Sequence, residues 1–296
     1  MTKQPLFTGA GVALVTPMHP DGSINHEKLV ELTEWQIKEG TDALIVCGTT
    51  GEAPTLGSPE HLEALKTVID CTAGRIPVIA GTGSNDTAHC MEMSRTAQHL
   101  GADGLLLVTP YYNKATQRGL VAHYSAVATA TDLPMILYNV PSRTGVNILP
   151  ETVVEMYEKI DNVVGLKQAN GDLSSVAKIA ADCDIPIYCG NDDQIVPILS
   201  LGGQGVISVL SNVLPKETHE ICAKWFAGDV AGSREIQLHY LDLCNALFSD
   251  INPVPVKAAM NMMGLDVGEC RLPLYPMEDK THRALEAVLR RHGLVK

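Results

Sequence analysis

The sequence of 296 residues contains no run that approaches the roughly 18 apolar residues needed to span a bilayer. Residues 1–10 also lack the basic flank, apolar stretch and cleavage site of a secretion signal. With 45% hydrophobic and 19% charged residues, the composition excludes a disordered chain, a collagen-like repeat and a coiled coil. We therefore expect a globular, cytoplasmic protein with no membrane partner.

Basic residues are scarce, with 22 Lys and Arg against 34 Asp and Glu and a formal net charge of −12. The field of such a protein repels phosphate backbones and anionic lipids. Nucleic acid is therefore not expected as a partner. An anionic substrate would need its own local positive charge, so a single Lys or Arg inside an apolar segment is a candidate site residue.

Several sequence motifs are absent: HExxH, CxxC pairs, the GxSxG elbow, the Walker P-loop and GxGxxG. Metal-dependent hydrolysis, serine-type hydrolysis and nucleotide chemistry therefore have no support. We expect neither a metal nor an organic cofactor. The eight cysteines are scattered over the chain, which favours reduced thiols over disulfides.

Short runs rich in Val, Ile and Leu recur along the first three quarters of the chain, as is typical of buried parallel strands. The predicted strands are residues 11–17, 43–47, 77–80, 105–109, 135–139, 163–167, 185–189 and 206–209. Helical patterns lie between them, at residues 27–40, 60–73, 86–100, 116–131, 150–159 and 174–181. This alternation predicts an α/β fold, a (β/α)₈ TIM barrel over residues 1–227, rather than an open doubly wound sheet.

After Gly228 the strand pattern stops. Helical patterns follow at residues 230–248, 255–263 and 278–291, separated by Asn252-Pro253 and Leu272-Pro273. They predict a small C-terminal helical domain over residues 228–296. Because no flexible linker precedes it, we expect it to pack on the barrel.

Lys167 ends the predicted strand 163–167, and catalytic groups of such barrels lie at the C-terminal ends of strands. An ammonium there must be paired, lose its proton or face a functional cavity. Desolvation lowers the pKa of an amine, and a free amine can attack a ketone to form a Schiff base. The alternative is a structural lysine, paired with a carboxylate or extended to the barrel rim.

Polar residues follow three other predicted strands. Thr49 and Thr50, between glycines at 48 and 51, offer donors for a carboxylate or a proton relay, although capping threonines of a plain turn fit equally well. Tyr112 and Tyr138 offer phenols that can relay protons, with packing as the alternative. Arg143 could hold a carboxylate bidentately or remain a solvated surface residue.

Taken together, residues 15–17, 48–52, 77–83, 109–113, 138–145, 165–167, 205–209 and 252–257 resemble the dihydrodipicolinate synthase family. This family lies within the N-acetylneuraminate lyase group of pyruvate-dependent class I aldolases. The resemblance runs nearly end to end, with the motifs in one order. It implies condensation of pyruvate with L-aspartate 4-semialdehyde, on the diaminopimelate route to lysine, without a cofactor.

The resemblance also implies roles for individual residues. Lys167 would form the Schiff base with pyruvate, Thr49 and Thr50 would bracket its carboxylate, and Tyr138 would relay protons with Thr49. Tyr112 would complete the relay from the neighbouring subunit of a tight dimer, and two dimers would form the family's usual tetramer.

For the second substrate, Arg143 matches the residue that holds the carboxylate of L-aspartate 4-semialdehyde. Gly190 and Ile207 match positions whose backbone lies close to the lysine. Two alternatives stay open: a sister aldolase that acts on a keto-sugar acid, for which Arg143 is poorly suited, and a catalytically silent barrel that binds pyruvate or lysine.

The sequence departs from the family pattern at two places near the site. Gln168 stands where the family usually has Glu, and Asn191 where Asp is common, so we expect an altered pyruvate affinity or rate.

The family's inhibitory lysine site is also altered. The chain keeps His61, Asn85 and Tyr111, but Ser58 and His89 replace a His and a Glu. Because His89 replaces the acidic partner of the ligand's ammonium group, we expect weak or absent inhibition by lysine.

Overall fold

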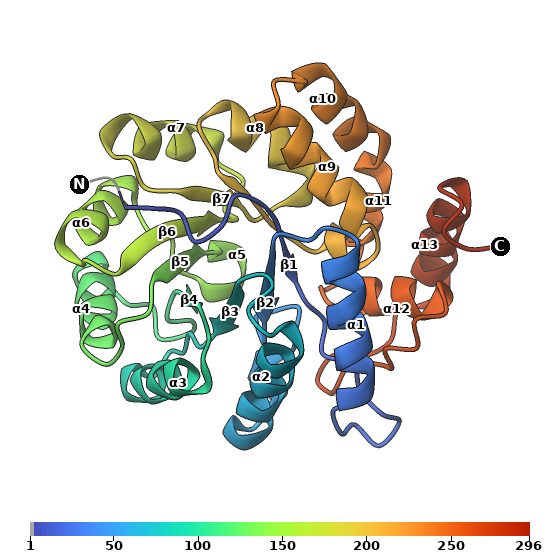
Figure 1. Cartoon of the computed structure of the whole chain (residues 1–296), viewed down its shortest axis with the longest axis horizontal. Coiled ribbons are helices and arrows are strands. Elements are labelled where there is room, and N and C mark those ends of the chain that lie inside the picture. Colours follow the sequence, from blue (N-terminus) through green and yellow to red (C-terminus); the bar gives the residue numbers. More distant parts are fainter. Residues whose placement is uncertain (1–2) are drawn as a thin grey trace.

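A computed structural model describes residues 3–296, and its eight parallel strands close into a barrel in chain order (Figure 1). The strands are β1 (Gly9–Ala13), β2 (Ala43–Val46), β3 (Val78–Gly81), β4 (Gly104–Val108), β5 (Met135–Asn139), β6 (Val163–Gln168), β7 (Ile187–Cys189) and β8 (Gly205–Ser208). Pairing of β8 with β1 closes the ring. The predicted (β/α)₈ barrel is confirmed.

Helices surround the barrel and alternate with the strands (Figure 1). They are α1 (His26–Lys38), α2 (Ser58–Thr72), α3 (Thr87–Leu100), α4 (Gln117–Ala128), α5 (Pro141–Thr144), α6 (Pro150–Lys159), α7 (Leu173–Asp182), α8 (Ile195–Ser200) and α9 (Pro215–Phe226). Short 3₁₀ helices are η1 (Ala53–Thr55), η2 (Asp192–Gln194) and η3 (Leu210–Asn212). No helix within residues 3–296 has both the length and the apolar character needed to cross a membrane.

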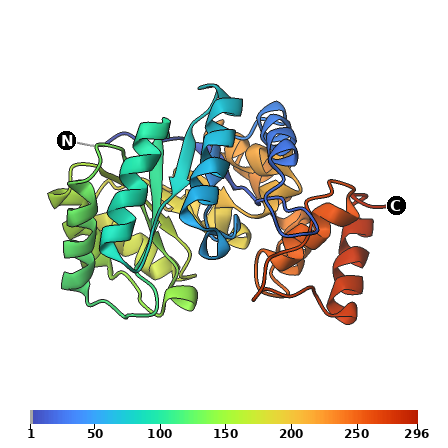
Figure 2. The ribbon, with the colours of Figure 1, turned by 90° about the horizontal axis from the view of Figure 1, so that it is seen from below.

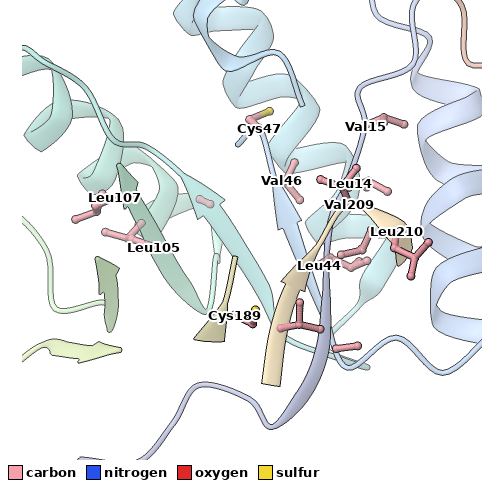
Figure 3. Packing of buried hydrophobic residues seen from close by; sticks show 14 of the residues in the cluster. Leu14, Val15, Leu44, Val46, Cys47, Leu105, Leu107, Cys189, Val209 and Leu210 are labelled. Atoms are coloured by element: carbon pink, nitrogen blue, oxygen red, sulfur yellow. The ribbon is translucent and has the colours of Figure 1, made fainter. Parts of the chain in front are cut away.

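Successive strand residues point to opposite sides of the barrel wall, and this divides the buried side chains into two cores. Ala43 and Ile45 of β2 belong to the small core inside the barrel. Leu44 and Val46, which alternate with them, belong to the larger core between strands and helices, part of which Figure 3 shows. The position of a residue in its strand therefore decides whether its side chain can reach the barrel interior.

The first strand ends at Ala13, so the prediction that it continues to residue 17 is wrong. Beyond Ala13, the Leu14 amide still donates to the Ile45 carbonyl at 3.0 Å. The amide of Val15, however, donates to the side-chain oxygen of Asn212 at 3.1 Å. A side chain thus replaces the neighbouring strand as the hydrogen-bond partner, and the chain leaves the sheet.

Four helices follow α9: α10 (Val230–His239), α11 (Leu241–Ala246), α12 (Val254–Met262) and α13 (Asp279–Arg291). In Figure 2 the last of them lie to one side of the barrel. The single helix expected over residues 230–248 is wrong, because the chain breaks at Tyr240. There it turns from α10, which packs on α9, to α11, which packs on α13. We propose that the barrel domain ends at residue 227 and that the C-terminal helical domain begins at residue 228.

Lys257 in α12 fastens the C-terminal helices to the loop after β2. Its ammonium donates to Glu52 Oε1 at 2.9 Å and to the carbonyls of Thr16 at 3.2 Å and Glu269 at 2.8 Å. The Arg271 amide donates to Glu52 Oε2 at 2.8 Å. Both charged side chains are almost fully buried, with 2% and 0% of their surface exposed. Removing one charge would leave the other buried without a partner.

We therefore predict that Lys257→Met lowers the free energy of unfolding by about 3–5 kcal/mol, because it strands the Glu52 carboxylate in the interior. Equilibrium unfolding in urea measures this loss. A matched control is Lys224→Met, since Lys224 pairs with Asp229 at the surface and such pairs contribute about 1 kcal/mol or less. Equal effects of the two variants would contradict the assignment of Lys257 as the anchor.

Candidate active site

Lys167 points into the barrel. Its strand neighbour Leu166 belongs to the outer core, so the alternation of side chains directs Lys167 inward. In the sheet it is paired in register with Tyr138 of β5 and Tyr188 of β7, and both tyrosines belong to the inner core. The strand order thus places Lys167 between two tyrosines of the inner core.

The ammonium of Lys167 has an aromatic neighbour but no ion-pair partner. Its nitrogen lies 4.3 Å from the centroid of the Tyr138 ring, within the range of a cation–π contact. Only 5% of Lys167 is exposed, and no carboxylate of residues 3–296 forms an ion pair with it. Lys167 therefore neither forms a structural salt bridge nor extends to the solvated rim. Its amine remains available for chemistry.

A cavity of about 430 Å³ opens beside this cluster, at the C-terminal ends of the strands. Thr49, Tyr138 and Arg143 contribute to its lining, while Lys167 and Thr50 do not. Among the described residues no hydrogen bond joins Thr49 to Tyr138. The structure therefore brings these side chains to one cavity, but it does not itself form the proton relay expected between them.

The loop that carries Thr49 and Thr50 is sharply bent. Cys47 and Glu52, on either side of it, have left-handed φ values of 53° and 59°, which residues other than glycine rarely adopt. At Gly51 a Cβ atom would lie 3.0 Å from the Cα of Cys47. This tight turn is held from outside by the Glu52–Lys257 ion pair.

One residue of the C-terminal region reaches two of the predicted site residues. The side-chain amide of Asn252 donates to Thr50 Oγ1 at 2.9 Å. Its main-chain carbonyl accepts a hydrogen bond from Arg143 Nη2 at 3.0 Å. Sequence reasoning missed this role, although Asn252 begins one of the segments that carried the family resemblance.

Gly190 and Ile207 lie at the ends of the strands that follow Lys167. The Gly190 amide donates to the Gln168 carbonyl at 2.8 Å, and a Cβ atom there would lie 2.6 Å from the Cβ of Ala169. Only glycine fits such a close approach. Ile207 belongs to the inner core with Tyr138.

Known proteins resemble this chain over nearly its whole length. The model of the dihydrodipicolinate synthetase family matches residues 6–292. The chain belongs to this family. A 4-hydroxy-tetrahydrodipicolinate synthase of a Thermoanaerobacter species is 55% identical over 294 residues, which cover 99% of each chain.

Solved structures of dihydrodipicolinate synthases share the whole fold. The chloride-inhibited enzyme of Acinetobacter baumannii, in complex with pyruvate, is 42% identical, has a TM-score of 0.94 and is matched over 97% of this chain and 99% of its own. The enzyme of Cyanidioschyzon merolae with lysine bound is 39% identical, has a TM-score of 0.96 and is matched over 99% and 100%.

Gln168, one departure from the pattern of the dihydrodipicolinate synthase family, faces away from the amine. It adjoins Lys167 in β6 and therefore points to the opposite side of the wall. Its Oε1 accepts a hydrogen bond from Asn139 Nδ2 at 2.8 Å, and the side chain is 3% exposed.

A buried acid that sequence reasoning missed is close enough to Lys167 for the two charges to interact. Asp192 is 3% exposed, and its Oδ2 accepts from the Val209 and Leu210 amides, both at 2.9 Å. Burial raises the pKa of Asp192, while these hydrogen bonds and the positive charge of Lys167 oppose the rise. The sequence signal was weak because two adjacent aspartates, at 192 and 193, look like a solvated turn.

The residues that the family resemblance assigns to a lysine site line the same cavity, except Asn85. Ser58, His61, His89 and Tyr111 all contribute to the lining. Burial, followed by the neighbouring charge of His89, lowers the pKa of His61 to about 4. This part of the cavity thus has a neutral imidazole at pH 7 and no carboxylate in its lining.

Proposed function

We propose that the protein acts as a 4-hydroxy-tetrahydrodipicolinate synthase, which condenses pyruvate with L-aspartate 4-semialdehyde. The observation that carries the proposal is the buried, unpaired amine of Lys167 beside the Tyr138 ring. It occurs in a chain that is 50–55% identical, over its full length, to relatives with that activity in their names.

In the proposed reaction the Lys167 amine attacks the ketone carbon of pyruvate, and loss of water gives an imine. The protonated imine withdraws electrons, so the methyl group loses a proton and an enamine forms. The enamine carbon attacks the aldehyde of the second substrate, whose oxygen becomes a hydroxyl group. The amino group of that substrate then attacks the imine carbon, closes the ring and releases Lys167. Tyr138 and Thr49 carry the protons.

The two carboxylates are assigned to different groups. Thr50, together with Thr49, binds that of pyruvate, and Gly190 and Ile207 shape the floor beside Lys167. Arg143 binds that of L-aspartate 4-semialdehyde, for which its fork of donors is suited. Support comes from the position of Arg143 in the cavity lining. It favours a small carboxylated aldehyde over the keto-sugar acid of a sister aldolase.

The active site also needs a second copy of the chain in this proposal. Tyr112 is 88% exposed and does not line the cavity of its own chain. Its left-handed φ of 73° costs free energy that a partner contact offsets. We assign Tyr112 to the proton relay of the neighbouring subunit in a tight homodimer, with two dimers forming a tetramer. Eight free cysteines favour the reducing cytoplasm.

We predict that purified protein consumes pyruvate only when L-aspartate 4-semialdehyde is present, and that Lys167→Ala abolishes this turnover because no imine can form. A coupled assay of product formation measures both. Lys178→Ala, which removes an exposed lysine paired with Glu151, should retain full activity. Cleavage of N-acetylneuraminate in place of condensation would support the sister aldolase instead.

We further predict weak or absent inhibition by lysine, and a gain of sensitivity of about tenfold or more in His89→Glu, because a carboxylate restores the partner for an ammonium group. Initial rates over a range of lysine concentrations measure both responses. Half-maximal inhibition of the native protein at sub-millimolar lysine would contradict the prediction.

A further inference from the structure

Among the described residues, the hydroxyl group of Thr50 accepts a hydrogen bond but donates none. Thr50 is 2% exposed, and its Oγ1 accepts a hydrogen bond from Asn252 Nδ2 at 2.9 Å. An amide nitrogen only donates, so it cannot take the hydroxyl proton in return. Among residues 3–296 no other group accepts that proton. Thr50 is therefore a buried donor without an acceptor, and such groups cost free energy unless a ligand satisfies them.

Asn252 is buried beside this hydroxyl, in a segment next to an anchored helix. It is 5% exposed, and it lies just before α12, which Lys257 fastens to the loop of Thr50 through Glu52. Asn252 does not line the cavity, and it meets the predicted site residues through hydrogen bonds to Thr50 and Arg143. Its side chain contacts Thr50, whereas its main chain contacts Arg143.

We propose that Asn252 is a positioning residue that holds the Thr50 hydroxyl as a hydrogen-bond donor to the carboxylate of pyruvate. This inference rests on the proposed function. By donating to Oγ1, the amide leaves the Thr50 proton one role, donation to a negatively charged ligand, and a charge-assisted bond of this kind is stronger than a neutral one.

The geometry separates the two substrates. A change in the Asn252 side chain alters the direction of the Thr50 hydroxyl but keeps the carbonyl that accepts from Arg143. The effect must therefore fall on the KM for pyruvate and leave the KM for L-aspartate 4-semialdehyde nearly unchanged.

Two substitutions test the proposal. Asn252→Asp keeps the shape but replaces the donor with an acceptor, which draws the Thr50 proton toward itself. We expect it to raise the KM for pyruvate about tenfold, the scale of one hydrogen bond to a charged group. Asn252→Leu removes the donor without adding a charge and should have a smaller effect. If Asn252 only supported the fold, the isosteric Asp would be the milder of the two.

The matched control is Asn261→Asp. Asn261, in α12, donates to the Gly268 carbonyl at 3.0 Å and accepts from the Val267 amide at 2.7 Å, away from the cavity. Asn261→Asp should leave the KM values for both substrates unchanged. In a Thr50→Val background, Asn252→Asp should have no further effect on the KM for pyruvate, because its route of action is gone.

An unchanged KM for pyruvate in Asn252→Asp, a tenfold rise that persists with Thr50→Val, or equal increases for both substrates would overturn the proposal. Loss of folding in both Asn252 variants, followed by thermal unfolding, would also overturn it by showing a structural role. Failure of the proposed function is distinct, because the native protein itself would then show no turnover.

Discussion

The site depends on one constraint: a primary amine held in the barrel interior without an ion-pair partner. A charged group there is costly, and the direct contact of the Lys167 ammonium is with the face of the Tyr138 ring at 4.3 Å. An ion pair would have offset part of this cost but also occupied the amine. Leaving it unpaired keeps the nucleophile available for a ketone.

The barrel provides this environment through its pleat. Because alternate residues face inward, Tyr138, Lys167 and Ile207 come from three different strands to one interior surface. The C-terminal helices contribute in a different way. Through Lys257 and Asn252 they hold the Thr50 loop and Arg143 from outside. The C-terminal helices therefore belong to the architecture of the site.

Much of the fold was predictable, because unbroken apolar runs mark buried parallel strands. Other features depend on tertiary contacts that no local pattern records. The end of β1 depends on Asn212, and the break at Tyr240 depends on α11 turning to α13. Lys167 stood out because it ends an apolar run. Asn252 did not, since its partners Thr50 and Arg143 are distant in sequence.

Chemical trapping of the imine tests the role of Lys167 most directly. Native protein is incubated with pyruvate and sodium borohydride, and the reduced adduct is located by peptide mass spectrometry. We predict a single adduct on Lys167, and none on Lys257, which is buried but paired with Glu52. Absence of an adduct, or an adduct on another lysine, would contradict this prediction.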